Sequence, residues 1–118
     1  MEKFPVERIE KPWGYELIWA RSGSYVGKML YVRAGESLSL QYHRRKEETL
    51  HLVSGRARFE VGPSQDELRT VELEAGESLH LPPRTVHRVV ALEDVRLLEA
   101  STPHLDDVVR LEDRYGRV

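Results

Sequence analysis

The sequence contains no cysteine, and this absence removes several kinds of chemistry at once. Without cysteine the chain has no disulfide, no thiolate ligand for a metal and no cysteine nucleophile. Long apolar runs are missing as well, because no stretch approaches the roughly 18 apolar residues of a membrane-spanning helix. Residues 1–5 lack the apolar core of a secretory signal. These absences predict a cytoplasmic protein without a membrane partner.

An excess of one charge is also lacking. The net charge is −2 over 118 residues, and both signs are mixed along the chain. No basic arm is present, which argues against a nucleic-acid partner. Apolar residues make up 40% and charged residues 32%, a composition typical of a soluble globular protein. The length predicts a single domain over residues 1–118.

Turn-forming residues recur about every ten positions, as in proteins built from many short strands. Between the turns lie short runs in which apolar and polar residues alternate. The runs cover 15–19, 28–32, 50–53, 57–61, 69–73, 88–90 and 95–100. Even spacing of short strands predicts an all-β sandwich or barrel.

Helical periodicity occurs only near the C-terminal end. Residues 101–103 read as a helix start, with proline at the first helical position. One stripe would then hold Leu105, Val108, Val109 and Leu111. We expect at most one short C-terminal helix.

Two segments of the chain are nearly identical. Residues 34–38 and 75–79 both read Ala-Gly-Glu-Ser-Leu, and each runs on to a histidine, His43 or His87. Two units are too few for a solenoid, so the repeat indicates two related halves of one domain.

Residues that follow the repeats form a candidate metal site. Gln41 and His43 are separated by one residue, which places both side chains on one face of a strand. Glu48 comes after the basic turn 44–47 and would return along a neighbouring strand, while His87 comes from the second repeat. Four donors from three strands can therefore converge inside a barrel on one divalent ion. Zn, Mn, Co, Ni and Fe all accept this donor set, which leaves positions open for water and substrate.

The spacing of these residues resembles the two cupin motifs, G-x5-H-x-H-x4-E-x6-G and G-x5-P-x-G-x2-H-x3-N. The first motif is matched by Gly35, Gln41, His43, Glu48 and Gly55, and the second by Gly76, Pro82 and His87. The departures are Gln41 for the first histidine, Arg84 for the turn glycine and Ala91 for the final asparagine. The resemblance implies a single-domain cupin, a double-stranded β-helix or jelly-roll barrel. Because cupins commonly dimerise and a short barrel leaves edge strands to cover, we also expect a homodimer.

A narrower resemblance is to the type II mannose-6-phosphate isomerase domain of bifunctional guanylyltransferase/isomerase proteins. The matching segments are 11–15, 38–55, 82–88 and 106–117. Glutamine at position 41 is what mannose-6-phosphate isomerases carry, whereas Lys46 and Leu50 replace the family's Arg and Trp. The resemblance implies metal-dependent interconversion of mannose 6-phosphate and fructose 6-phosphate, with a sugar phosphate as the small-molecule partner.

Four basic residues are candidates for the catalytic work. Lys46 lies in a charge run that is usually a solvated face, yet it occupies the family's Arg position and could reach a phosphate. Arg110 and Arg117 match the family's C-terminal arginines, with a surface salt-bridge network as the alternative. Lys28 would face the barrel interior if the strand phase is right, and a buried lysine can serve as a base.

Other functions and roles stay open at this point. The replacement at Leu50 favours a non-catalytic or differently specific cupin that binds a sugar or nucleotide sugar. Two histidines and a carboxylate can also hold Fe(II) in a small dioxygenase, although Gln41 argues against that. The Trp13 side chain is interpreted as a core plug, or alternatively as a wall of the sugar pocket.

Overall fold

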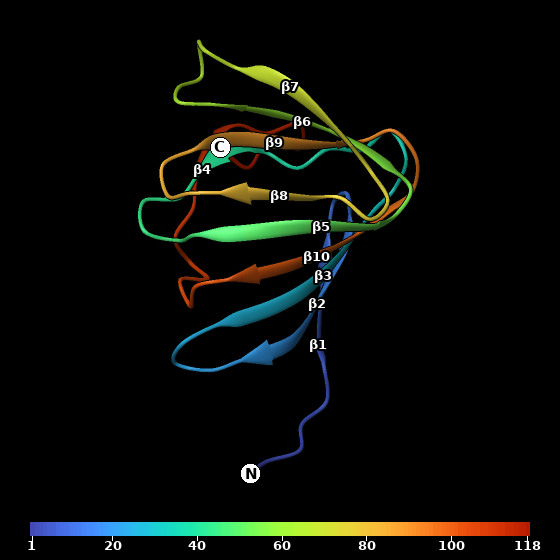
Figure 1. The fold of residues 1–118 in the computed structure, drawn as a ribbon, viewed down its shortest axis with the longest axis vertical. Helices are drawn as coiled ribbons and strands as arrows, with labels where there is room; N and C mark the ends of the chain where they lie inside the picture. Colours follow the sequence, from blue (N-terminus) through green and yellow to red (C-terminus); the bar gives the residue numbers. More distant parts are fainter.

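The computed structural model describes residues 1–118 as eleven β-strands and no helix. The strands form two antiparallel sheets that face each other (Figure 1). One sheet has the order β1 (Glu7–Lys11), β2 (Gly14–Arg21), β3 (Val26–Val32), β10 (Val95–Ser101), β5 (Glu48–Ser54) and β8 (Ser78–Leu81). The other has the order β11 (Val109–Glu112), β4 (Leu40–Tyr42), β9 (Val86–Ala91), β6 (Arg56–Gly62) and β7 (Arg69–Glu74). With no helix in the chain, no helix is available to cross a membrane.

The core lies between the sheets and draws on both of them. Leu52 and Leu97 from the six-stranded sheet pack in one apolar cluster with Phe59 and Val89 from the five-stranded sheet. Leu52, Phe59 and Leu97 are fully buried. Burying each such side chain contributes about 1.5–3 kcal/mol, so the alternating pattern is sufficient to drive the sheets together.

The predicted strands are confirmed, because every alternating run lies inside a strand of the structure. The all-β cupin architecture is confirmed with them. In β10 the alternation is complete, with buried and exposed residues following one another from Val95 to Ser101. Alternation of this kind is what one buried face and one solvated face of an antiparallel sheet require.

The sequence repeat corresponds to a repeat in hydrogen bonding. In the segment 35–36, the glycine N–H donates to the carbonyl of Ala91 (2.9 Å), whose own N–H donates to the glutamate carbonyl (3.0 Å). In the segment 76–77 the same pair of bonds is made with Leu52, at 2.8 and 3.0 Å. Both glycines have positive φ, 82° and 94°, which favours glycine at these turns. The turn at the start of the first repeat is therefore hydrogen-bonded to β9, and the turn at the start of the second repeat to β5. Each of these strands also carries a predicted metal ligand.

The structure has no C-terminal helix, which agrees with the expectation of at most one. Residues 109–112 form strand β11, in which Val109 pairs with Tyr42 and Arg110 with Gln41 of β4. A helix of this length gains little by itself, because nucleation costs more than a few intrahelical bonds return. The edge of β4 provides backbone hydrogen-bond partners for these residues, so they pair with β4 as a strand.

Candidate functional site

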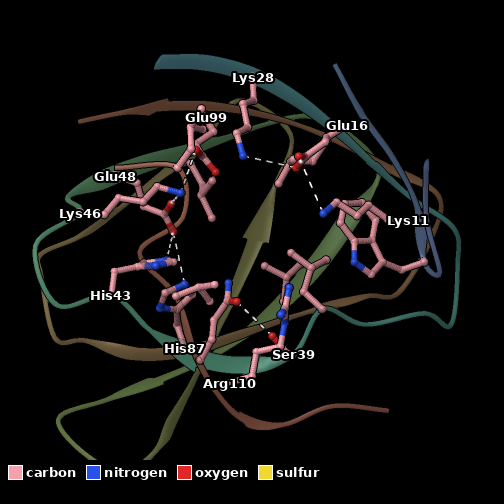
Figure 2. A pocket seen from close by; sticks show the side chains of 18 of the residues that line it. Lys11, Glu16, Lys28, Ser39, His43, Lys46, Glu48, His87, Glu99 and Arg110 are labelled. Carbon is pink, nitrogen blue, oxygen red and sulfur yellow. Dashed lines mark hydrogen bonds and ion pairs between the residues drawn. The ribbon is translucent and has the colours of Figure 1, made fainter. Parts of the chain in front are cut away.

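One pocket between the two sheets is lined by all of the residues predicted to do chemistry (Figure 2). They are the four candidate metal ligands Gln41, His43, Glu48 and His87, and the four basic residues Lys28, Lys46, Arg110 and Arg117. The strand phase of Lys28 is inward, as its predicted role requires. The sequence repeats and the alternation thus bring the residues of both motifs to one place.

Three of the four candidate ligands form a compact buried cluster. His43 follows β4, Glu48 opens β5 and His87 lies in β9. The Nε2 atoms of His43 and His87 are 3.6 and 3.3 Å from the same carboxylate oxygen, Oε1 of Glu48. The three ligand atoms all lie within 4.8 Å of one another. One divalent ion can be reached by all three.

The two imidazoles are held in the tautomer that a metal needs. The Nδ1 atom of His43 lies 2.5 Å from the carbonyl oxygen of Asp107, and that of His87 lies 2.9 Å from the carbonyl of Thr85. Since a carbonyl only accepts, each neutral ring carries its proton on Nδ1 and presents a lone pair on Nε2. Both Nε2 atoms are buried without a hydrogen-bond partner. Unpartnered buried polar atoms are costly, and a cation between them removes that cost, so this donor set fits a divalent metal.

Glu48 supplies the negative charge of the cluster. Burial on its own raises the pKa of this carboxyl, but the ammonium of Lys46, 3.0 Å from its Oε2 atom, favours the ionised form and lowers the pKa of Glu48 below its ordinary value. An ionised carboxylate beside two imidazoles is the ligand set expected of an open, catalytic type of metal site.

Gln41 lies next to this cluster. It is opposite His87 on the paired strands β4 and β9. Its side-chain oxygen accepts a hydrogen bond from the hydroxyl of Ser39 at 3.0 Å, which orients the amide. An amide oxygen has two lone pairs, so one remains for a further partner.

Lys46 is not on the solvated face that its charge run suggested. The residue is only 6% exposed, and its ammonium lies 3.0 Å from Glu48 and 3.1 Å from Glu99. Burial lowers the pKa of Lys46, but the two carboxylates outweigh this and raise it above 10.5. The carboxylate of Asp107 accepts the backbone N–H groups of residues 44–46 and so fixes the loop. Lys46 is therefore a fixed cation inside the pocket.

Two acidic residues of the pocket were missed by the sequence reasoning. Glu16 on β2 lies 3.4 Å from the ammonium of Lys28, and Glu99 on β10 accepts from Ser101 Oγ at 3.1 Å. Both are buried. A signal was present, since each glutamate shares the inward parity of an apolar neighbour, Ile18 or Leu97. A charged residue in phase with core residues indicates a function or a buried ion pair.

The two C-terminal arginines differ from each other. Arg117 forms a double contact with the buried carboxylate of Asp113, at 2.8 and 2.9 Å. Arg110 forms no ion pair, and its Nε atom is buried without a partner. A guanidinium left free at the wall of a pocket is available to an anion that enters it.

Trp13 combines the two roles considered for it. The side chain belongs to the apolar core and is 3% exposed, and it also lines the pocket. Its ring therefore forms part of the apolar wall of the pocket.

The balance of charge in the pocket favours an anion. The lining holds five basic residues, Lys11, Lys28, Lys46, Arg110 and Arg117, against three acidic ones, Glu16, Glu48 and Glu99. Asp113 neutralises Arg117, and a divalent ion would add further positive charge. The arrangement is therefore suited to a ligand that carries a phosphate or carboxylate group.

Comparison with known proteins places the chain in a family. Residues 3–113 match the family described as Mannose-6-phosphate isomerase C-terminal. The chain belongs to this family.

Named relatives of this isomerase-family domain are longer proteins. Mannose-1-phosphate guanylyltransferase ManC of Salmonella typhimurium is 34% identical over 93% of the chain. The alginate biosynthesis protein AlgA of Pseudomonas aeruginosa is 32% identical over 92% of it. The chain spans only 23% of the length of either relative.

Solved structures agree with the cupin fold. Oxalate decarboxylase OxdC of Bacillus subtilis superposes with a TM-score of 0.77 and 26% identity, over 89% of this chain and 30% of its own. CapF of Staphylococcus aureus superposes with a TM-score of 0.77 at 17% identity, over 93% of this chain and 35% of its own. At that identity the likeness to CapF concerns the fold alone.

Arg84 marks a place where the isomerase-family domain departs from the cupin motif. It replaces the motif's turn glycine, and its φ of 68° lies in the left-handed region that glycine adopts more easily. Its backbone N–H donates to the carbonyl of His43 at 2.7 Å. The turn between β8 and β9 is thus tied to one of the candidate ligands, at some backbone strain.

Proposed function

We propose that this domain is a metal-dependent sugar-phosphate isomerase that interconverts mannose 6-phosphate and fructose 6-phosphate. One observation carries the proposal: two buried imidazole nitrogens without partners lie beside an ionised glutamate in a pocket with surplus positive charge. Membership of the Mannose-6-phosphate isomerase C-terminal family supports the substrate. The name of AlgA also suggests a role in polysaccharide biosynthesis.

In this proposal His43, Glu48 and His87 hold the metal, with Gln41 as a fourth, neutral ligand. A divalent ion bound there would act as a Lewis acid on an oxygen of the sugar. The Bacillus subtilis oxalate decarboxylase, which shares the fold, has Mn(II) centres, and the nitrogen and oxygen donors here suit Mn as well as Zn, Co, Ni or Fe.

The remaining residues bind and orient the substrate. Arg110 holds the phosphate, because its guanidinium has no other ionic partner and can form paired hydrogen bonds to phosphate oxygens. Lys46 stays protonated and keeps Glu48 and Glu99 in place. Trp13 closes one side and excludes water from the sugar, which strengthens the electrostatic contacts in the pocket.

The test is turnover by protein loaded with each candidate metal in turn. Formation of fructose 6-phosphate from mannose 6-phosphate is followed in a coupled assay, and the reverse reaction is measured separately. Glu48→Gln should abolish turnover, whereas Glu60→Gln, on the outer face of the other sheet, should retain it. A metal-loaded wild type that converts neither sugar phosphate would overturn the proposal.

A second candidate is a domain that binds a sugar phosphate or nucleotide sugar without converting it. Leu50 favours it, because this residue replaces the tryptophan of the family pattern and lines the pocket. A ligand that binds only the folded state raises the unfolding temperature. Selective stabilisation by one such ligand, with no turnover of it, would support this second candidate.

A further inference from the structure

A row of charged side chains crosses the inner face of the six-stranded sheet. Neighbouring strands β1, β2, β3, β10 and β5 each place one in the pocket, and a lysine from the loop before β5 joins them (Figure 2). In spatial order they are Lys11, Glu16, Lys28, Glu99, Lys46 and Glu48. The signs alternate along the row. Buried charges are retained only when paired, so the row is a single electrostatic unit.

Glu16 differs from the other two acids of this row. Its carboxylate contacts Lys28 at 3.4 Å and Lys11 at 4.0 Å, one lysine on each oxygen. Neither contact is short, and no imidazole touches it. Figure 2 shows Glu16 across the pocket from His43 and His87.

The other two acids have roles that occupy them. Glu48 faces both imidazoles and belongs to the candidate metal cluster. Glu99 accepts from Ser101 and from Lys46 through the same oxygen, at 3.1 Å each, and its side chain is 6% exposed. Glu16 makes only longer contacts, at 3.4 and 4.0 Å, and its side chain is 10% exposed, so it is the acid of the pocket that its neighbours hold least tightly.

We propose that Glu16 is the catalytic base that carries the proton between C1 and C2 of the sugar, a role that rests on the proposed isomerase function. Its carboxylate takes the proton from C2 of the open-chain aldose, and the C2–H electron pair becomes the C1=C2 double bond. The carbonyl π pair moves to O1, which takes a proton from Lys28, and a cis-enediol results.

The second half of the reaction restores both residues. The O2 hydroxyl returns a proton to Lys28 while its O–H electron pair forms the C2=O bond. In the same step the C1=C2 pair takes the proton from Glu16 at C1, and fructose 6-phosphate is complete. No oxidant or reductant is consumed. Lys28, predicted from the sequence as a base, here moves the hydroxyl proton, consistent with its position as a donor to Glu16.

The experiment compares wild type, Glu16→Gln, Glu16→Asp and the control Glu60→Gln. Glu60 is a matched control because it is also a strand glutamate paired with a basic residue, Arg88, at 2.7 Å. Four quantities are measured: kcat and KM, bound metal, affinity for mannitol 6-phosphate by calorimetry, and deuterium uptake at C1 and C2 in D2O. The polyol phosphate has no carbonyl and reports binding alone.

General acid–base catalysis is worth about 10²–10⁴-fold, so Glu16→Gln should lower kcat by that factor and slow deuterium uptake equally. Metal content and mannitol 6-phosphate affinity should stay within about threefold, because the carbon-bound proton is transferred only during the reaction. Glu16→Asp should recover part of the rate, and Glu60→Gln should match wild type.

Two outcomes overturn the assignment of Glu16 while leaving the isomerase function intact. One is a Glu16→Gln variant with kcat within about threefold of an active wild type. The other is a rate loss matched by an equal loss of metal or of mannitol 6-phosphate binding, which marks a structural role. If the wild type itself shows neither turnover nor deuterium uptake with any hexose or pentose phosphate, the proposed function and the Glu16 role both fall.

Discussion

Gln41 and His87 lie directly opposite each other on the antiparallel strands β4 and β9, although they come from different halves of the sequence repeat. This pairing joins the two motifs of the chain at one point. It brings an amide from the first half beside an imidazole from the second. The register of two short strands therefore determines whether a four-ligand site can form.

Gln41 should contribute measurably to metal affinity. Removing a residue that hydrogen-bonds to a metal ligand usually lowers metal affinity by about 10–100-fold. Removing a ligand itself should lower the affinity at least as much. We expect Gln41→Ala to weaken metal binding by about tenfold or more in a competition titration. Gln41→His should bind at least as tightly as wild type, because imidazole is a stronger ligand for borderline metals. Equal affinities for Gln41→Ala and wild type would remove Gln41 from the ligand set.

Arg110 should matter for substrate binding and not for stability. Its guanidinium has no ionic partner, so Arg110→Met removes a partly buried charge that the fold does not compensate. We expect an unchanged or higher unfolding temperature, together with a KM for mannose 6-phosphate raised by about 10–100-fold, since a hydrogen bond to a charged group is worth about 1.5–3 kcal/mol.

Arg58→Met is the control for Arg110, because Arg58 is also without an ion pair but is exposed on β6. This variant should leave KM unchanged. A KM for Arg110→Met equal to that of Arg58→Met would show that the phosphate is bound elsewhere in the pocket.

Asp107 should make stability depend on pH in the acid range. Hydrogen bonds from the backbone N–H groups of Arg45, Arg44 and Lys46 lower the pKa of Asp107 from 3.8 to about 2. Because the folded-state pKa is the lower one, this stabilisation is present above the ordinary pKa and is lost as the pH falls from about 4 to 2. Asp107→Asn should be less stable than wild type at pH 7, and the difference should shrink towards pH 2.

Denaturant unfolding at pH 7, 4 and 2 measures this effect. The matched control is Asp106→Asn, which alters the exposed neighbouring acid whose side chain makes no hydrogen bond within the protein. It should follow wild type at each pH. If the free energies of unfolding of wild type and Asp107→Asn differ by the same amount at pH 7 and at pH 2, Asp107 does not stabilise the fold in the way described.

Much of the fold could be predicted from alternation alone. In β10 the inward residues Val95 and Leu97 specify the buried face, and the runs in the other long strands do the same. Strand β11 could not be found in this way. The spacing of Leu105, Val108 and Leu111 suits a helix, and the partner that decides for a strand, the open edge of β4, exists only once the sheet has formed.

The candidate site shows the same division. The spacing of His43, Glu48 and His87 was sufficient to predict that they converge, because strand parity and a sequence repeat are both local signals. The burial of Lys46 could not be predicted from the sequence, since a run of three basic residues normally lies in water. Its position depends on Asp107 and Glu99, which lie far along the chain and approach it only in the folded protein.

The most direct test of the account is the metal content of protein purified without a chelating column. Mass spectrometry of the wild type should find close to one divalent transition-metal ion per chain. The folded double variant Glu48→Ala/His87→Ala should contain almost none. If the double variant is folded and carries as much metal as the wild type, the central claim that His43, Glu48 and His87 form a metal site is wrong.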